Sequence, residues 1–248
     1  MKLRPLGNSS IKVSPLCLGT MTFGEQNDIK QSFRIMNKAE ENGINFLDTA
    51  EIYSAPIKKE TYGLTEKIIG KWLKEKKNRQ KIIIASKIAG PFNKKAAQWI
   101  PRKNLKYNEK NISDAVDNSL KRLGTDYIDL YQLHTPQRNS NFFGKLGYKH
   151  QNNKIENFEE ILYVIKKLIK KGKLRSFGIS NETPWGLSKY LEISKIKNLP
   201  RISSVQNPYN LLNRTYEIGL AEISLRENCG LIGYSPLASG YLTGKYRF

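Results

Sequence analysis

Four polar side chains in this sequence could together transfer a proton: a carboxylate, a phenol, an ammonium and an imidazole. Asp48 and Tyr53 belong to the segment NFLDTAEIY, Lys87 ends the segment IIIASK, and His134 ends LYQLH. Each segment contains a short apolar run, so the four residues are expected at or just beyond the ends of strands. On parallel strands these side chains would meet at one edge, where they could act as a proton-transfer device.

The chemical types suggest a role for each side chain. A phenol with an unperturbed pKa near ~10 donates poorly at neutral pH, whereas a nearby ammonium lowers that pKa. Lys87 could supply this charge to Tyr53, Asp48 could keep Lys87 protonated, and His134 could hydrogen-bond the reacting oxygen. Taken singly, each residue also has a structural explanation: a turn or cap for the aspartate, packing for the tyrosine, solvation for the lysine, and a satisfied buried imidazole.

The elements that must position these residues repeat one pattern, in which a short apolar run leads to an amphipathic helix. This alternation predicts parallel strands joined by helical crossovers, as in a (β/α)8 TIM-type barrel. An N-terminal β-hairpin is expected from residues 3–5 and 13–14. The expected barrel strands are 15–19, 45–48, 82–87, 128–133, 176–180, 203–206 and 231–234. The expected helices are 29–42, 64–74, 111–123, 158–171, 184–195 and 216–227.

Size and composition narrow the class of protein. The 248 residues are interpreted as a single domain, since barrels of about 250 residues are common. The net charge of +20 permits an anionic partner. The lysines form no stripe interleaved with aromatic residues, so nucleic-acid binding is not expected. No apolar run approaches the roughly 18 residues of a membrane span, and the N-terminus lacks a secretory segment, which favours a cytoplasmic location.

The two cysteines predict no chemistry of their own. Cys17 and Cys229 lie far apart in sequence, each within an apolar segment. Small buried residues explain them better than a disulfide or a metal pair, so no metal site is expected.

Two connections are longer than the others, at residues 88–110 and 135–157, and both leave from the carboxyl ends of expected strands. On a parallel barrel that end carries the chemistry, so these loops are interpreted as pocket walls or lids. Their aromatic residues are candidate substrate contacts, namely Trp99, Phe142, Phe143 and Tyr148. The alternative, that these aromatic side chains only pin the loops in place, is equally compatible with the sequence.

Seven segments spread over nearly the whole chain form an ordered set: CLGTMTFGEQ, GINFLDTAEIY, ASK, SLKRLGTDYIDLYQLH, GISNET, QNPYNLLNR and YSPLASGYLTGKY. They resemble the aldo-keto reductase family, and its Tas-like bacterial branch in particular. The resemblance implies an enzyme that interconverts carbonyl compounds and alcohols with NADP(H). It implies Tyr53 as general acid or base, Lys87 and Asp48 tuning it, and His134 orienting the carbonyl.

The resemblance also implies an extended cofactor across the mouth of the barrel, and no GxGxxG motif follows the first strand here. By motif, Ser180, Asn181 and Gln206 would hold the nicotinamide amide, while Tyr234 would stack on its ring. The residues expected beneath the cofactor or around its pyrophosphate are Gly19, Thr20, Met21, Asp48, Ser235, Pro236, Leu237, Ala238, Ser239 and Lys245.

Against the family pattern, the barrel is expected to be incomplete. The sequence ends at Phe248, just beyond the seventh strand and its loop, without the seventh helix, the eighth strand and the eighth helix. That arrangement would leave a sheet edge unpaired. By the same resemblance it would lack the segment that recognises the 2′-phosphate of the cofactor. The resemblance implies NADPH, and NAD stays open because that segment is absent. Two alternatives to an active enzyme are a cofactor-binding regulatory subunit resembling potassium-channel β subunits and an inactive truncated remnant.

Overall fold

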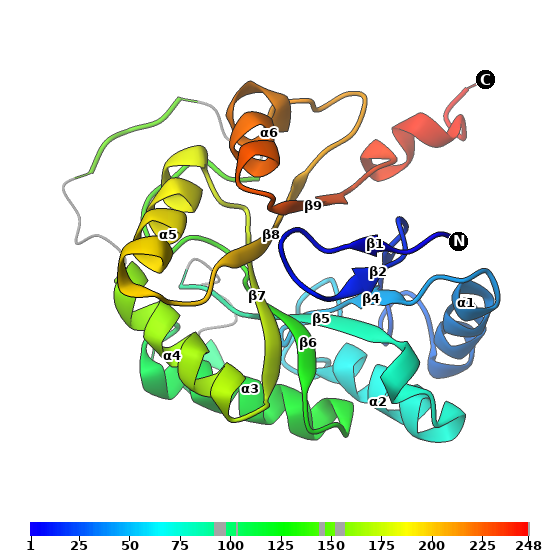
Figure 1. The fold of residues 1–248 in the computed structure, drawn as a ribbon. Coiled ribbons are helices and arrows are strands. Elements are labelled where there is room, and N and C mark those ends of the chain that lie inside the picture. Colours follow the sequence, from blue (N-terminus) through cyan, green and yellow to red (C-terminus); the bar gives the residue numbers. More distant parts are fainter. Residues whose placement is uncertain (92–97, 103, 144–146, 152–156, 248) are drawn as a thin grey trace.

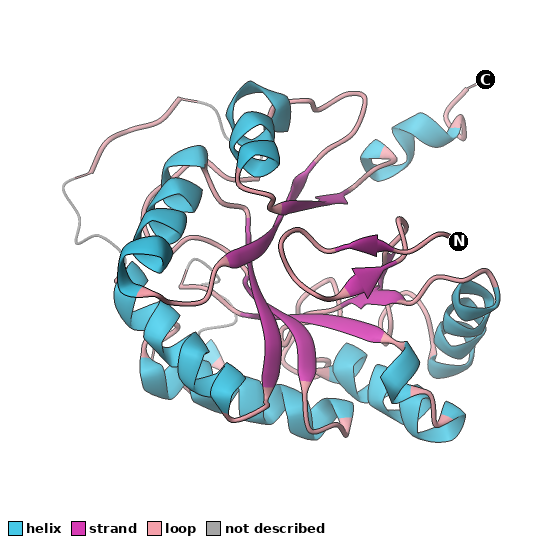
Figure 2. Ribbon diagram, viewed as in Figure 1, coloured by secondary structure: helices cyan, strands magenta, loops and turns pink. Residues whose placement is uncertain are grey.

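A curled sheet of seven parallel strands forms the centre of the computed structural model, which describes residues 1–248 except 92–97, 103, 144–146, 152–156 and 248. The helices surround its outer face (Figures 1 and 2). In sheet order, the strands are β3 (Leu18–Gly19), β4 (Phe46–Asp48), β5 (Ile83–Ile88), β6 (Ile128–Leu133), β7 (Leu174–Ser180), β8 (Ile202–Pro208) and β9 (Gly230–Tyr234). A separate antiparallel hairpin comprises β1 (Arg4–Pro5) and β2 (Lys12–Val13).

The helices alternate with the strands. The described helices are α1 (Ile29–Glu41), α2 (Leu64–Lys76), α3 (Glu109–Leu123), α4 (Phe158–Lys170), α5 (Pro184–Lys197) and α6 (Tyr216–Arg226), with 3₁₀ segments η1 (Arg79–Lys81) and η3 (Ala238–Thr243). A side chain caps the first turn of α1, α3, α4 and α5. In α1, the Asp28 carboxylate accepts a hydrogen bond from the Gln31 N–H, and the Gln31 side-chain oxygen accepts one from the Asp28 N–H, which satisfies two free donors at the helix start.

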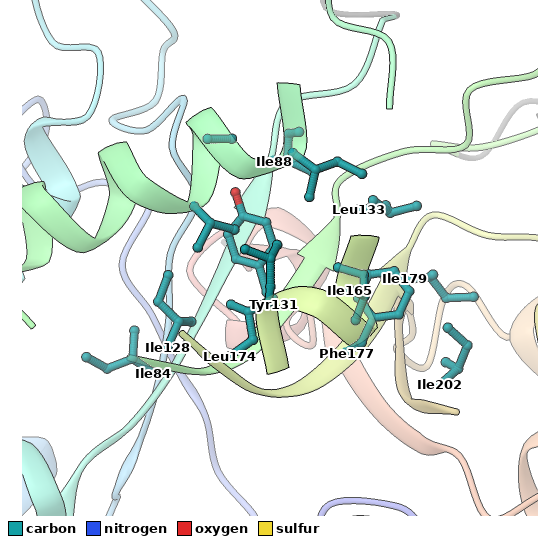
Figure 3. Close-up of a cluster of buried hydrophobic side chains, with 14 of the residues drawn as sticks. Ile84, Ile88, Ile128, Tyr131, Leu133, Ile165, Leu174, Phe177, Ile179 and Ile202 are labelled. Carbon is teal, nitrogen blue, oxygen red and sulfur yellow. The ribbon is translucent and has the colours of Figure 1, made fainter. Parts of the chain in front are cut away.

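The main core lies between the sheet and its helices. Tyr131 of β6, Phe177 of β7 and Ile202 of β8 are almost fully buried and face Ile165 of α4 in one cluster (Figure 3). Strands covered on both faces must carry apolar residues in near-continuous runs, as the IIIASKI and YIDLYQL segments do. Each such side chain contributes roughly 1.5–3 kcal/mol relative to an exposed position.

The hairpin closes the amino end of the curled sheet. Leu6, Ile11 and Val13 are buried against Phe46 of β4 and Ile232 of β9. The loop between β1 and β2 lies beneath β8 and β9, where the Asn8 amide donates to the Ile202 carbonyl at 3.3 Å. The hairpin therefore contacts both β4, near the first strand of the sheet, and β8 and β9, which are its last two strands.

The register of the strands places polar residues at one edge. Asp48 pairs with Ala85, Lys87 pairs with Gln132, and Ser180 pairs with Gln206. Because all seven strands are parallel, their carboxyl ends lie together, and these side chains gather there.

The predicted fold class is confirmed: the described residues form an incomplete (β/α) TIM-type barrel whose sheet begins at β3 and ends at β9. The prediction of a strand at 15–19 was too long, because its first residue is a proline without an N–H for a sheet ladder. Helix α3 begins earlier than expected, at Glu109, because Asn108 caps it by accepting from the Asn111 N–H. The 3₁₀ segment η3 was not predicted.

Among the residues that the structure describes, no helix is both long and apolar enough to cross a membrane.

Candidate active site

A cavity of about 340 Å³ opens at the carboxyl ends of the strands. Three of the four predicted catalytic residues line it: Asp48 from the end of β4, Tyr53 from the following loop, and His134 just after β6. Lys87 lies behind Asp48 in β5 and is completely buried. The sequence spacing therefore brings all four residues together.

Asp48 and Lys87 form a close ion pair. Lys87 Nζ donates to Asp48 Oδ2 at 2.7 Å and to the Thr49 carbonyl at 2.7 Å. The second carboxylate oxygen, Oδ1, accepts from the Gln206 amide at 2.8 Å. Both oxygens of Asp48 thus have donors, which compensates the carboxylate for its partial loss of hydration.

Tyr53 stands between the ion pair and the histidine. Its hydroxyl oxygen lies 3.4 Å from His134 Nε2, and the two rings meet edge to face with centroids 5.6 Å apart. Lys87 Nζ lies 5.2 Å from the centroid of the Tyr53 ring. A hydroxyl, an imidazole nitrogen and an ammonium therefore surround one end of the cavity.

Burial raises the pKa of Tyr53 above its ordinary value, although the charge of Lys87 acts to lower it. Lys87 therefore acts on this phenol in the predicted direction, but the loss of hydration outweighs the nearby ammonium and the pKa is raised overall. The phenol stays protonated at neutral pH and is an acid rather than a phenolate.

His134 and Lys87 respond to burial in different ways. Burial, reinforced by the charge of Lys87, lowers the pKa of His134 to about 3, so its imidazole is neutral at neutral pH. Burial also acts to lower the pKa of Lys87, but the charge of Asp48 and its hydrogen bond to Lys87 act to raise it, and it lies above its ordinary value. Lys87 therefore keeps its charge inside the protein.

Polar side chains of β7, β8 and β9 line the opposite wall of the cavity. The Asn181 amide donates to the His134 carbonyl at 2.9 Å, and its oxygen accepts from the Tyr234 hydroxyl at 2.7 Å. The Ser180 hydroxyl donates to the Gln206 carbonyl at 2.9 Å. Asn181 adopts a positive φ of 56°, which turns the chain sharply after β7 and points its amide across the barrel mouth.

Comparison with known proteins agrees with this geometry. The family model described as "Aldo/keto reductase family" matches residues 15–248. The chain belongs to the aldo/keto reductase family. It is 46% identical to Protein tas of Escherichia coli over 99% of this chain and 71% of that protein. It is 34% identical to the uncharacterized oxidoreductase YrpG of Bacillus subtilis, over 99% and 69%. The likeness to Aldo-keto reductase YhdN of the same bacterium is 30%, over 99% and 65%.

These relatives support the Tas-like branch, and the chain is an oxidoreductase. Aldo/keto reductases use a nicotinamide cofactor, and one end of this cavity suits a nicotinamide ring. It offers amide and hydroxyl groups from Ser180, Asn181 and Gln206 beside the face of Tyr234. The other cofactor candidates that line the cavity are Gly19, Thr20, Met21, Asp48, Ser235 and Pro236.

The remaining cofactor candidates of this aldo/keto reductase lie outside the cavity. Leu237 is 53% exposed, and Ala238 and Ser239 open the η3 segment with positive φ values of 48° and 55°. Lys245 Nζ lies 4.9 Å from the centroid of the Tyr246 ring. The cavity lining therefore brings together Ser180, Asn181, Gln206 and Tyr234 and ends, along the chain, at Pro236.

The four substrate candidates occupy different places. Phe143 lines the catalytic cavity, while Phe142 and Phe143 both line a neighbouring cavity beside α5 and α6. Trp99 packs against Tyr62 with ring centroids 5.7 Å apart. Tyr148 is exposed and contacts His150. Of the four candidates, Phe143 alone lines the catalytic cavity.

Sequence reasoning missed Gln132 and the position of Cys17. The Gln132 amide lies 3.4 Å from Asp48 Oδ1, and its own oxygen is buried without a partner in the described part of the chain. The signal was present, since Gln132 precedes His134 by two positions and such residues of a strand face the same side. Cys17 lines the cavity near Asp48 rather than lying wholly in the core.

Proposed function

We propose that this oxidoreductase reduces small aldehydes or ketones to alcohols with NADPH in the cytoplasm, and that Tyr53 supplies the proton. The observation that carries the proposal is the cluster of a protonated phenol, a neutral imidazole and a buried ammonium at one cavity wall. The cofactor, when bound, supplies the hydride. The protein must then orient the carbonyl and deliver the proton.

The proton leaves Tyr53 Oη for the carbonyl oxygen as negative charge develops there. His134 Nε2, 3.4 Å from that hydroxyl, fixes the carbonyl oxygen beside it. Lys87 Nζ stabilises the phenolate that forms, and the 2.7 Å bond to Asp48 holds this ammonium in place. The hydrophobic surroundings that raise the phenol pKa strengthen these interactions, because charges attract more strongly away from water.

The carboxamide of the cofactor would bind at Ser180, Asn181 and Gln206. Gln206 also donates to Asp48 at 2.8 Å, so this wall is connected directly to the catalytic ion pair. Tyr234 is held by its bond to Asn181, and its ring would define which face of the nicotinamide meets the substrate.

The test compares the native chain with Tyr53→Phe by following NADPH consumption with a panel of aldehydes and ketones. The variant should lose activity by about 100-fold or more in kcat, while NADPH binding measured by fluorescence stays within twofold. Tyr163→Phe on the exposed face of α4 is the matched control and should keep full activity. Equal turnover of Tyr53→Phe and the native chain would contradict the proposal.

A further inference from the structure

We infer that the buried Glu51–Arg102 ion pair positions Tyr53 for catalysis by fixing its loop against the end of β5. This inference rests on the proposed role of Tyr53 as the acid. Glu51 lies between Asp48 and Tyr53 in sequence, and Arg102 belongs to the long connection that follows β5. The pair thus joins the catalytic loop to a segment that supplies none of the four catalytic side chains.

Glu51 holds its loop to β5 through both its backbone and its side chain. The Glu51 N–H donates to the Lys87 carbonyl at 3.1 Å. Its Oε1 accepts from the Ala89 N–H at 2.6 Å. These two bonds reach Lys87 itself and the second residue after it. A shift of Glu51 would therefore change the relation between the Tyr53 loop and the ammonium.

Arg102 fixes the Glu51 carboxylate with a bidentate contact. Its Nη1 donates to Oε2 at 2.8 Å, and its Nη2 donates to Oε1 at 2.5 Å. The side chains of Arg102 and Glu51 are 2% and 0% exposed. A planar guanidinium that meets a carboxylate in this manner sets its orientation as well as its charge. Arg102 therefore determines which way Glu51 presents Oε1 to β5.

The apolar surroundings of the pair include the catalytic tyrosine. Ala50, Ile52, Ala89, Ile100 and Leu105 form a buried cluster, and Tyr53 packs against it. Arg102 lies in sequence between Ile100 and Leu105, so the segment that carries the guanidinium also supplies part of the wall behind Tyr53. The Tyr62 hydroxyl donates to Glu51 Oε2 at 3.3 Å, which gives the carboxylate another hydrogen bond besides those from Arg102.

A purely stabilising role explains this arrangement less well. Removing two charges from water costs several kcal/mol per ion, and apolar residues of similar size often stabilise a protein as much. A directional contact at the catalytic loop has a use that apolar packing lacks, since small misplacements of catalytic groups reduce rates strongly.

The first experiment compares Arg102→Ala and Arg102→Lys with Arg79→Ala as the matched control. Arg79 also pairs with a fully buried carboxylate, Asp129 at 2.8 Å, but near the amino end of β6. Arg102→Ala should lower kcat by about 10- to 100-fold with the KM for NADPH within twofold. Arg102→Lys keeps the positive charge without the bidentate contact to Glu51, and should recover part of the lost kcat. Arg79→Ala should lower Tm with kcat within twofold.

A second measurement follows the protein without turnover. In protein labelled with ¹³C at the tyrosine Cζ, the Tyr53 resonance is the one absent from Tyr53→Phe. Arg102→Ala should move this resonance and its titration midpoint, whereas Arg79→Ala should leave both unchanged. If Tyr53→Phe keeps full activity, the proposed function fails, yet the spectrum still tests the positioning.

A double variant covers the case in which Arg102→Ala does not fold. Glu51→Gln with Arg102→Leu removes both buried charges and keeps an oxygen that can accept from the Ala89 N–H. A folded double variant with a reduced kcat and a moved Tyr53 resonance supports the inference. Native kcat and an unmoved resonance in folded Arg102→Ala, or in the folded double variant, would overturn it.

Discussion

His134 gives the site a pH dependence whose sign follows from its burial. Its pKa falls from 6.5 in the unfolded chain to about 3 in the folded protein. Below pH 6.5 the His134 imidazole binds a proton in the unfolded state but stays neutral in the folded state, so acid favours unfolding. This histidine's contribution to the free energy of unfolding should decrease by about 1.4 kcal/mol for each pH unit between 6.5 and 3, and stay constant above pH 7.

Urea unfolding of the native chain and of His134→Gln between pH 7.5 and 4.5 measures this contribution. Carboxylates that titrate in the same range contribute equally to both proteins, so the difference between them isolates the histidine. The stability advantage of the native chain should shrink as the pH falls. A difference that is independent of pH would show that the imidazole is already charged or exposed in the folded protein.

At the scale of residues, the sequence predicts the strand-end side chains better than the contacts that tune them. Asp48, Lys87 and His134 follow apolar runs, and parallel strands bring such positions together. The net effect on the Tyr53 pKa depends on how deeply the phenol is buried, which spacing alone does not determine. Arg102 lies in a long connection without periodicity, so nothing in the sequence indicates that it meets a buried carboxylate.

At the scale of elements, Gly70 tests how closely helices α2 and α3 pack. A Cβ at Gly70 would lie 2.6 Å from the Arg122 carbonyl oxygen and 2.7 Å from that of Leu123. Alanine is intrinsically the better helix former by about 1 kcal/mol. Here the backbone of α3 cannot yield cheaply, so Gly70→Ala should instead destabilise the protein by about 1–3 kcal/mol. Thermal unfolding with Lys71→Ala, an exposed neighbour in the same helix, as the control measures the effect; a stabilised Gly70→Ala would contradict the close packing.

The helices and strands themselves were largely predictable, because each amphipathic period is long and repeats. The exact ends of the elements were harder to predict. Strand β8 extends to Pro208, two residues beyond its expected end, because the β9 backbone continues the register to Tyr234. The η3 segment depends on positive φ values at Ser239 and Gly240, a local conformation that no apolar period encodes.

At the scale of the whole molecule, the open sheet depends on the hairpin that bridges its two sides. Gly7, between β1 and β2, has a φ of +53°, and a Cβ there would overlap the Ser203 carbonyl and lie 2.7 Å from the Gly230 nitrogen. Gly7→Ala should therefore push the hairpin away from β8 and β9. The same substitution at Gly172, with a φ of +72° and no neighbour within 4 Å, carries only the backbone penalty of about 1–2 kcal/mol.

We expect Gly7→Ala to lose more stability than Gly172→Ala by about 1–3 kcal/mol, the usual range for overpacking a closely fitted site. Hydrogen exchange shows where that energy is lost. Because β9 is the last strand of the described sheet and pairs only with β8, its amides should exchange faster in Gly7→Ala while those of β5 and β6 stay protected. Equal losses in the two variants, with β9 still protected, would show that the hairpin contributes nothing to holding the ends of the sheet.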